Sequence, residues 1–155
     1  MLKIYCARPI NGCTIDEIRA YYGGVKKKLN KIGYDVLTPM IQSEYVRVSK
    51  KFQATAEGMN PGASNRAIVS RDHWLVKNCD ILYINLLSAQ SVSIGSVSEL
   101  AWAYDNGKHI VMVIDKENNP HKHAFVLEMA DVIYDNEKDA IQYLEDLNYK
   151  TKRSK

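Results

Sequence analysis

The sequence predicts an α/β domain of the flavodoxin-like, doubly wound type, with a five-stranded parallel sheet and helices on both faces. Three observations lead to this prediction. Five short segments are almost continuously apolar, as in parallel strands that are buried on both sides. Helical patterns separate these segments. The length of 155 residues suits one compact domain.

The positions and order of the predicted strands indicate where a ligand would bind. They comprise residues 3–7, 34–37, 80–85, 109–114 and 131–134. We expect the strand order 2-1-3-4-5, in which the direction of winding reverses between the first and third strands. Sheets of this kind bind ligands beyond the carboxyl ends of the strands at that point. The loops over residues 7–13 and 86–98 are therefore the predicted site.

The intervals between the strands have helical periodicity. The first helix is the clearest, because Thr14 and Glu17 form a capping-box pattern and Gly33 suits its C-terminal stop. Four further helices are expected at about residues 65–77, 97–106, 123–129 and 137–147. Residues 40–63 show no clean period, and long segments of that kind are often functional.

Bulk composition limits the class of protein. We expect one domain over residues 1–148 and a basic flexible tail over 149–155. A net charge of +3 is too small to indicate a nucleic acid polymer as partner. No apolar run reaches the roughly 20 residues of a membrane span, and a strand begins at once without a signal-peptide pattern. A cytoplasmic protein is expected.

The cysteines do not suggest a disulfide or a zinc site. Cys6, Cys13 and Cys79 are an odd number without CxxC spacing. Cys6 and Cys79 adjoin apolar strands, which predicts buried free thiols.

The segment from Ser91 to Ala103 carries the strongest chemical signal. It is a loop of small residues that enters an apolar helix, and backbone N–H groups at such a helix start favour an anion. Ser96 and Glu99 also match a capping box, in which Glu99 would only return to its own helix. Spacing alone leaves both interpretations open.

Together with its neighbours, this segment resembles the nucleoside 2-deoxyribosyltransferase family. The resemblance rests on Ile4-Tyr5, on Arg71-Asp72 and on Ser93-x-Gly95-x-x-x-Glu99-Leu100-x-x-Ala103, and it extends over about residues 2–147. It implies that Glu99 attacks the anomeric carbon, that Asp72 handles the base and that Tyr5 orients the nucleophile. No metal ion or other cofactor is expected.

Elementary chemistry is consistent with these roles. Cleavage of an N-glycosidic bond develops positive charge on the sugar, which a carboxylate can stabilise and then trap covalently. We expect Glu99 to be ionised at neutral pH because the helix dipole favours its charge. The leaving base needs a second carboxyl. Asp72 lies on the apolar stripe of its helix, although it could instead be a structural acid paired with a basic neighbour.

The expected substrate contacts concern the sugar and its 5′ end. The resemblance implies that Ser93 stands where enzymes acting on free nucleosides carry an acidic residue and where the related deoxynucleoside 5′-monophosphate N-glycosidases carry serine. A hydroxyl at a helix start can donate to a phosphate, whereas an acid would repel one. The alternative is that Ser93 and Arg8 are ordinary loop residues. The further expected substrate contacts are Arg8, Asn11, Gly12, Gly95 and Ser96.

The loop after the fourth strand contains His121 and His123. The resemblance implies that this loop reaches the active site of a neighbouring subunit in a homodimer or higher homo-oligomer, where His123 and Phe125 would touch substrate. Surface histidines are the alternative. Tyr45, Arg47, Phe52 and Gln53 could cover the base.

Two classes of function remain open. The first is an enzyme that cleaves 2′-deoxynucleosides or their 5′-monophosphates through a 2-deoxyribosyl–glutamate intermediate, with a free nucleobase as acceptor or, in the alternative hydrolase, water. The second is a non-catalytic nucleotide-binding module, because a fold alone does not fix activity. A flavin or receiver domain is disfavoured, because the first loop has neither a hydroxyl-rich phosphate cradle nor clustered acids.

Overall fold

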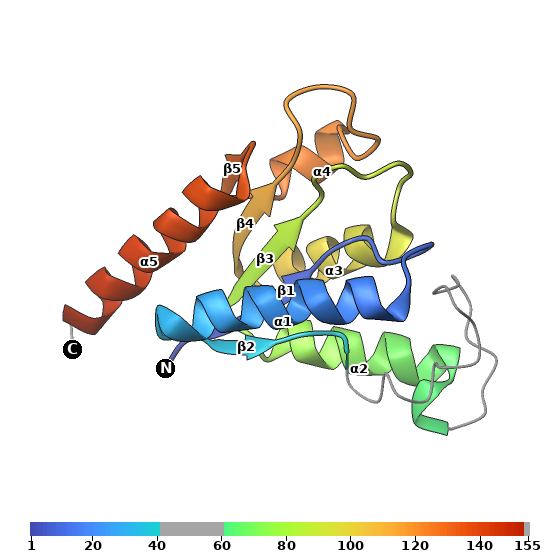
Figure 1. The fold of residues 1–155 in the computed structure, drawn as a ribbon, viewed down its shortest axis with the longest axis horizontal. Coiled ribbons are helices and arrows are strands. Elements are labelled where there is room, and N and C mark those ends of the chain that lie inside the picture. The colour runs from blue at the N-terminus through green and yellow to red at the C-terminus, as the bar shows by residue number, and fades with distance from the viewer. Residues whose placement is uncertain (41–60, 154–155) are drawn as a thin grey trace.

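The structure is a computed structural model that describes residues 1–40 and 61–153, so expectations for Tyr45, Arg47, Phe52 and Gln53 lie outside the described residues. It contains a parallel sheet with the strand order β2-β1-β3-β4-β5 (Figure 1). The strands are β1 (Lys3–Ala7), β2 (Asp35–Leu37), β3 (Ile81–Asn85), β4 (His109–Val113) and β5 (Val132–Tyr134). The predicted flavodoxin-like fold and strand order are confirmed.

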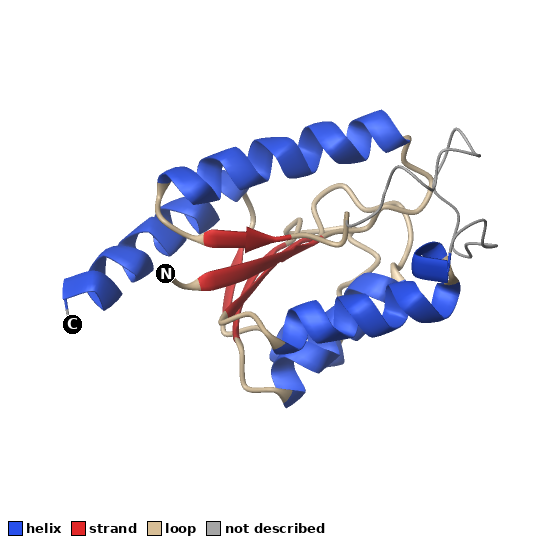
Figure 2. Ribbon diagram, turned by 90° about the horizontal axis from the view of Figure 1, so that it is seen from below, coloured by secondary structure: helices blue, strands red, loops and turns tan. Residues whose placement is uncertain are grey.

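Helices cover both faces of the sheet (Figure 2). One face carries α1 (Ile15–Lys31) and α5 (Glu137–Arg153), which pack against β1, β3 and β4 through one apolar cluster. The other face carries α2 (Asn65–Lys77), α3 (Ile94–Asp105) and α4 (Ala124–Glu128), with a second cluster. A short 3₁₀ helix, Pro61–Ala63, precedes α2. The three central strands β1, β3 and β4 are therefore covered on both sides, which accounts for their apolar composition.

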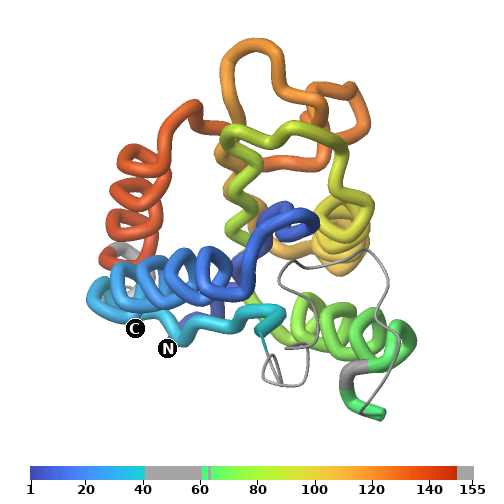
Figure 3. The backbone as a smooth tube through the Cα atoms, turned by 45° about the vertical axis from the view of Figure 1, so that its right-hand side comes forward, coloured from blue at the N-terminus to red at the C-terminus, as the bar shows by residue number. Residues whose placement is uncertain are grey.

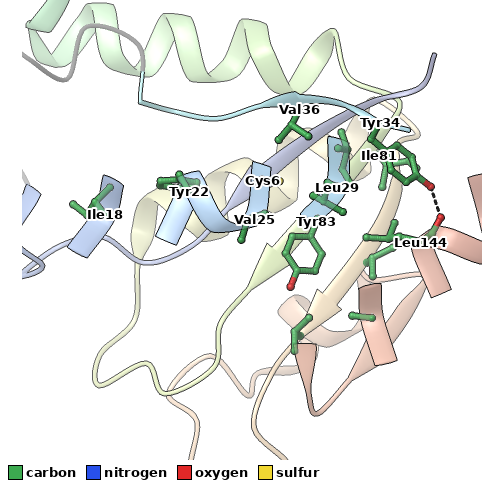
Figure 4. Packing of buried hydrophobic residues seen from close by; sticks show 14 residues of the cluster. Cys6, Ile18, Tyr22, Val25, Leu29, Tyr34, Val36, Ile81, Tyr83 and Leu144 are labelled. Carbon is green, nitrogen blue, oxygen red and sulfur yellow. Dashed lines mark hydrogen bonds between the residues drawn. The ribbon is translucent and has the colours of Figure 1, made fainter. Parts of the chain in front are cut away.

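The ends of α1 follow the sequence pattern. Thr14 and Glu17 form the complete capping box. After the helix, Gly33 has a φ of 94°, a conformation that side chains with a Cβ rarely adopt. The buried face of α1, with Tyr22 and Leu29, packs on the sheet (Figure 4). In the same cluster Tyr34 donates a hydrogen bond of 2.7 Å to the backbone oxygen of Leu144 on α5.

Two helix boundaries differ from the predictions. Helix α3 begins at Ile94, with Ser93 as its N-cap, although the pattern indicated a start near residue 97. Residues 94–98 include glycine, valine and two serines, which are weak helix formers and conceal the start. Helix α5 runs to Arg153 rather than to about 147, so the backbone of residues 149–153, expected as part of a flexible tail, is helical.

The three cysteines are free thiols. Cys6 and Cys79 are free and buried, as predicted, and Cys13 is free and half-buried. Among the helices of the described segments, none has the length and apolar character needed to cross a membrane.

The sheet brings two loops together. Strand β1 pairs with both β2 and β3, so the reversal of winding falls between β1 and β3 as expected. The loop that leaves β1 and the loop that leads from β3 into α3 lie at the same end of the sheet (Figure 3). Side chains from β1, α2 and α3 can therefore meet there.

Candidate active site

A buried hydrogen bond joins Tyr5 of β1 to Glu99 of α3. The Tyr5 hydroxyl donates to Glu99 Oε1 at 2.5 Å, and both side chains are buried. Burial, followed by the negative charges of Glu99 and Asp72, raises the pKa of Tyr5 well above its usual value. Tyr5 thus stays a phenol and a donor, and one oxygen of Glu99 is fixed in position.

Glu99 is not the permanently ionised carboxylate that the sequence suggested. Its pKa is raised to about 8, mainly because burial removes water from the charged form; the hydrogen bond from Tyr5 lowers it and the charge of Asp72 raises it further. The dipole argument failed because α3 begins at Ile94. Glu99 therefore lies beyond the first turn of α3, and the field of the helix N-terminus acts mainly within that turn.

The capping-box alternative for Glu99 does not hold. Ser93, and not Ser96, is the N-cap of α3, and its hydroxyl accepts from the Ser96 N–H at 3.3 Å. The Glu99 side chain turns toward β1 instead of toward the start of its own helix.

Asp72 of α2 is the second carboxyl near Glu99. Its side chain is 13% exposed, and Arg71 Nε donates to Asp72 Oδ1 at 3.1 Å. Burial raises the pKa of Asp72 to about 6, while the charge and hydrogen bond of Arg71 lower it. Asp72 has the basic neighbour that the structural alternative required, and yet its charge also acts on Glu99 and Tyr5.

Arg71 also holds the backbone that precedes α2. Its guanidinium donates to the backbone oxygen of Pro39 at 3.3 Å and to that of Gly62 at 3.5 Å. One side chain therefore links the end of β2 and the start of α2 to Asp72. The sequence motif Arg71-Asp72 gave no sign of this bridge.

The residues expected to bind the sugar and phosphate lie in two loops. Gly95 is exposed in the first turn of α3, where an added Cβ would meet open space, and Ser96 is buried. In the loop after β1, Asn11 is exposed and Gly12 has a φ of 83°. These positions share one end of the sheet with Glu99, and their contact with substrate stays a prediction.

Arg8 already has an aromatic partner. Its guanidinium carbon lies 4.2 Å from the centre of the Tyr21 ring, and its Nε donates to the backbone oxygen of Pro9 at 3.2 Å. The charge of Arg8 lowers the pKa of Tyr22, against larger opposing effects. The guanidinium is thus held beside α1, at the loop where a phosphate was expected.

Tyr22 is a further group near the site that periodicity assigned only to the core. Burial raises its pKa well above the usual value, and the charge of Glu99 is the next largest cause. Its buried hydroxyl has no hydrogen-bond partner among the residues that the structure describes. No sequence signal separates such a tyrosine from its apolar neighbours on α1.

The two histidines after β4 have different environments. His123 is exposed and caps α4, where its Nδ1 accepts from the Phe125 N–H at 3.2 Å, and Phe125 is 77% exposed. His121 is buried and its Nε2 accepts from the Ser93 N–H at 2.8 Å. The surface alternative is therefore wrong for His121, and no sequence pattern indicated its contact with Ser93.

No group of three or more His, Cys, Asp or Glu side chains in the described parts of the chain could hold a metal ion. What the site offers is a buried and a half-buried carboxyl, both with raised pKa values, and a phenol that donates to the buried one. Such a pair can hold one shared proton near neutral pH, which leaves one acid and one anion.

The sequence model of the nucleoside 2-deoxyribosyltransferase family matches residues 4–142. The chain belongs to this family. The match includes Tyr5 of β1, Asp72 of α2 and Glu99 of α3. No curated protein sequence matches the chain at a significant level.

Solved structures of related enzymes share the fold of this family member. A 2-deoxyribosyltransferase from Bacillus psychrosaccharolyticus superimposes with a TM-score of 0.65, 17% identity and coverage of 91% of each chain. The enzyme from Leishmania mexicana gives 0.66 and 17%, covering 94% of this chain and 98% of that one. A CMP N-glycosidase from Clostridium botulinum gives 0.57 and 17%, covering 92% and 97%. At such identities the matches establish the fold.

The raised pKa of Glu99 predicts a pH-dependent gain in stability for Glu99→Gln. Because the folded protein keeps a proton on Glu99 that the unfolded chain loses above about pH 4.5, the stability of the wild type falls as the pH rises toward 8. Glutamine keeps the acceptor for Tyr5 and has no such loss. Glu99→Gln should therefore be more stable at pH 7, by about 3 kcal/mol, since each pH unit contributes about 1.4 kcal/mol.

Urea denaturation at pH 5 and pH 7 measures this gain. The difference between variant and wild type should fall below about 1 kcal/mol at pH 5, because that pH lies only half a unit above the unfolded pKa. Glu145→Gln, which changes an exposed glutamate on α5, is the matched control and should show no gain at either pH. Equal effects of Glu99→Gln at both pH values would contradict the prediction.

Proposed function

We propose that this family member cleaves the N-glycosidic bond of a 2′-deoxynucleoside, or of its 5′-monophosphate, and transfers the 2-deoxyribosyl group to another nucleobase through Glu99. The observation that carries the proposal is the buried hydrogen bond of 2.5 Å from Tyr5 to Glu99 Oε1, beside the second carboxyl of Asp72. Family membership supports a nucleoside or nucleotide as substrate. The choice among acceptors and the role of each residue belong to the proposal.

In the first half-reaction Glu99 is the nucleophile. Its carboxylate attacks C1′ as the bond between C1′ and the base nitrogen breaks, and the bonding electrons leave with the base. Asp72 gives its proton to the base. The product is a 2-deoxyribosyl ester of Glu99 and a neutral free base. Tyr5 holds Oε1, so that the orientation of the carboxylate is set before substrate arrives.

In the second half-reaction the ester is released. A ring nitrogen of another base attacks C1′, the ester bond breaks, and Glu99 recovers its negative charge. Asp72 takes the proton that the incoming base loses. Water attacking in the same way would release 2-deoxyribose, which is the hydrolytic outcome.

Between about pH 6 and pH 8 the two raised pKa values leave one proton on the pair, and without substrate it resides mainly on Glu99, which has the higher pKa. The cycle therefore needs this proton to move to Asp72. The reactive form has one proton between the two carboxyls, placed on Asp72, and the negative charge on Glu99. Substrate binding brings the developing positive charge of the sugar over Glu99, which favours this arrangement of the shared proton.

Trapping the intermediate tests the proposal. Protein quenched during turnover of a deoxynucleoside should gain the mass of a deoxyribosyl group on the peptide that contains Glu99. The same experiment with a deoxynucleoside 5′-monophosphate reports whether the phosphate is accepted. Glu99→Ala should lose the adduct and at least about a thousandfold in kcat, whereas the exposed Glu145→Ala should keep both.

Product analysis distinguishes the acceptors. Exchange of a labelled free base into nucleoside indicates transfer, and release of free 2-deoxyribose indicates hydrolysis. Binding of nucleosides without base release or adduct would contradict the enzyme and leave a nucleotide-binding module.

The shared proton predicts a bell-shaped dependence of kcat/KM on pH. Activity should rise as the first proton leaves near pH 6 and fall as the second leaves near pH 8, because Glu99 must be charged and Asp72 must be protonated. Asp72→Asn has no acid to lose. Its residual activity, lower by about a hundredfold, should rise with pH to a plateau. An alkaline fall that persists in Asp72→Asn would contradict this assignment.

The proposal includes a homo-oligomer. Large apolar side chains are more than half exposed on the three helices of one sheet face: Val69 and Trp74 on α2, Ile94 and Tyr104 on α3, and Phe125 on α4. Exposed apolar groups of this number are typical of surfaces that bind another protein. We propose a second copy of the chain as the occupant, so that His123 and Phe125 reach the partner's substrate.

Light scattering after size-exclusion chromatography tests this part. The wild type should have the mass of a dimer or a larger oligomer. Phe125→Glu should lower that mass and reduce kcat/KM by about tenfold or more. Ile133→Lys, on the exposed side of β5, is the control and should leave the mass unchanged. A monomeric wild type with full activity would contradict the oligomer.

A further inference from the structure

His121 lies in the loop between β4 and α4, and its side chain is 1% exposed. Its ring has a defined tautomer. The Ser93 backbone N–H points at His121 Nε2 at 2.8 Å, and an N–H group can only donate, so Nε2 carries no proton. Nδ1 lies 3.2 Å from Asn119 Oδ1, an acceptor, and therefore carries the proton. Burial lowers the pKa of His121, which keeps this neutral form at neutral pH.

Asn119 fixes the ring of His121 in place. Asn119 Oδ1 also accepts from the His121 backbone N–H at 2.9 Å. Asn119 Nδ2 donates to the backbone oxygen of Leu86 at 2.7 Å and to Asp115 Oδ2 at 2.8 Å, and Asp115 Oδ2 accepts from the Ser88 N–H at 2.8 Å. The loop after β4 is thus bonded to the loop after β3 at three points, Leu86, Ser88 and Ser93.

The third of these points is the start of α3. Ser93 caps the helix through its hydroxyl, and its backbone oxygen accepts from the Val97 N–H at 3.0 Å. A shift of Ser93 would move the first turn of α3 at once. Glu99 lies further along the helix and is held independently by Tyr5, so it would move less.

We infer that His121 is a positioning residue of the reaction, which fixes Ser93 and the first turn of α3 for contact with the substrate. The inference rests on the proposed function and on the predicted contacts of Ser93, Gly95 and Ser96 with the sugar and its 5′ group. His121 acts only through Ser93, and its loss should therefore weaken substrate binding more than the chemical step.

Two substitutions separate the contact from the volume of the ring. His121→Phe keeps a ring but has no acceptor, which leaves the Ser93 N–H unpaired. His121→Gln can place an amide oxygen near the position of Nε2 and restore the acceptor. We expect His121→Phe to raise KM by about tenfold, the effect of one lost hydrogen bond, with a smaller change in kcat. His121→Gln should stay near the wild-type values.

Far-UV circular dichroism and thermal unfolding establish that each variant is folded. Proton–nitrogen NMR of the wild type, labelled in its histidines, provides a second test that needs no variant. It should show His121 protonated on Nδ1 and bare on Nε2 at pH 7. An Nε2-protonated or a charged ring would overturn the inference.

The kinetic outcomes keep the two proposals apart. A wild type without turnover on any deoxynucleoside or deoxynucleotide would overturn the proposed function and the inference with it. An active wild type with unchanged KM in folded His121→Phe would overturn the inference alone. A decrease in kcat as large as the increase in KM in His121→Phe, without recovery in His121→Gln, would also overturn it, because such changes indicate a general loss of structure.

Discussion

The site depends on a carboxyl that is buried at a cost. Removing Glu99 from water disfavours its charge, and the single hydrogen bond from Tyr5 offsets only part of that penalty, so its pKa remains raised to about 8. A neutral isostere would be less costly in the folded protein. The sequence retains an acid where stability favours a neutral group, which is the expected balance at a site built for chemistry.

The fold explains why this cost can be sustained. Tyr5 lies on a central strand, and α2 and α3 pack on the same face through an apolar cluster, so each polar group is carried by a rigid element. Arg71 limits the rise in the pKa of Asp72, which separates the two carboxyls by about two pH units. The order of these values leaves the proton of the substrate-free site mainly on Glu99, so the proposed roles require substrate binding to shift it to Asp72.

Much of the architecture was predictable, because buried parallel strands and capped helices leave strong local patterns. The capping box at Thr14, the stop at Gly33 and the whole of α2 follow from such patterns. The meeting of Tyr5, Asp72 and Glu99 was predictable only through the family resemblance, since no local signal relates residues so distant in sequence. The protonation of Glu99 was not predictable. It depends on burial and on the true start of α3, which weak helix formers concealed. The contact of His121 with Ser93 depends on two loops approaching each other, which sequence periodicity does not report.

Carbon-13 NMR of the glutamate side chains tests the central claim most directly. The resonance that disappears in Glu99→Gln should titrate near pH 8 in the wild type. It should titrate at lower pH in Asp72→Asn, because the neighbouring charge is gone, and at higher pH in Tyr5→Phe, because the hydrogen bond is gone. Titration of Glu99 in the ordinary range near pH 4.5, unmoved by either substitution, would contradict the account.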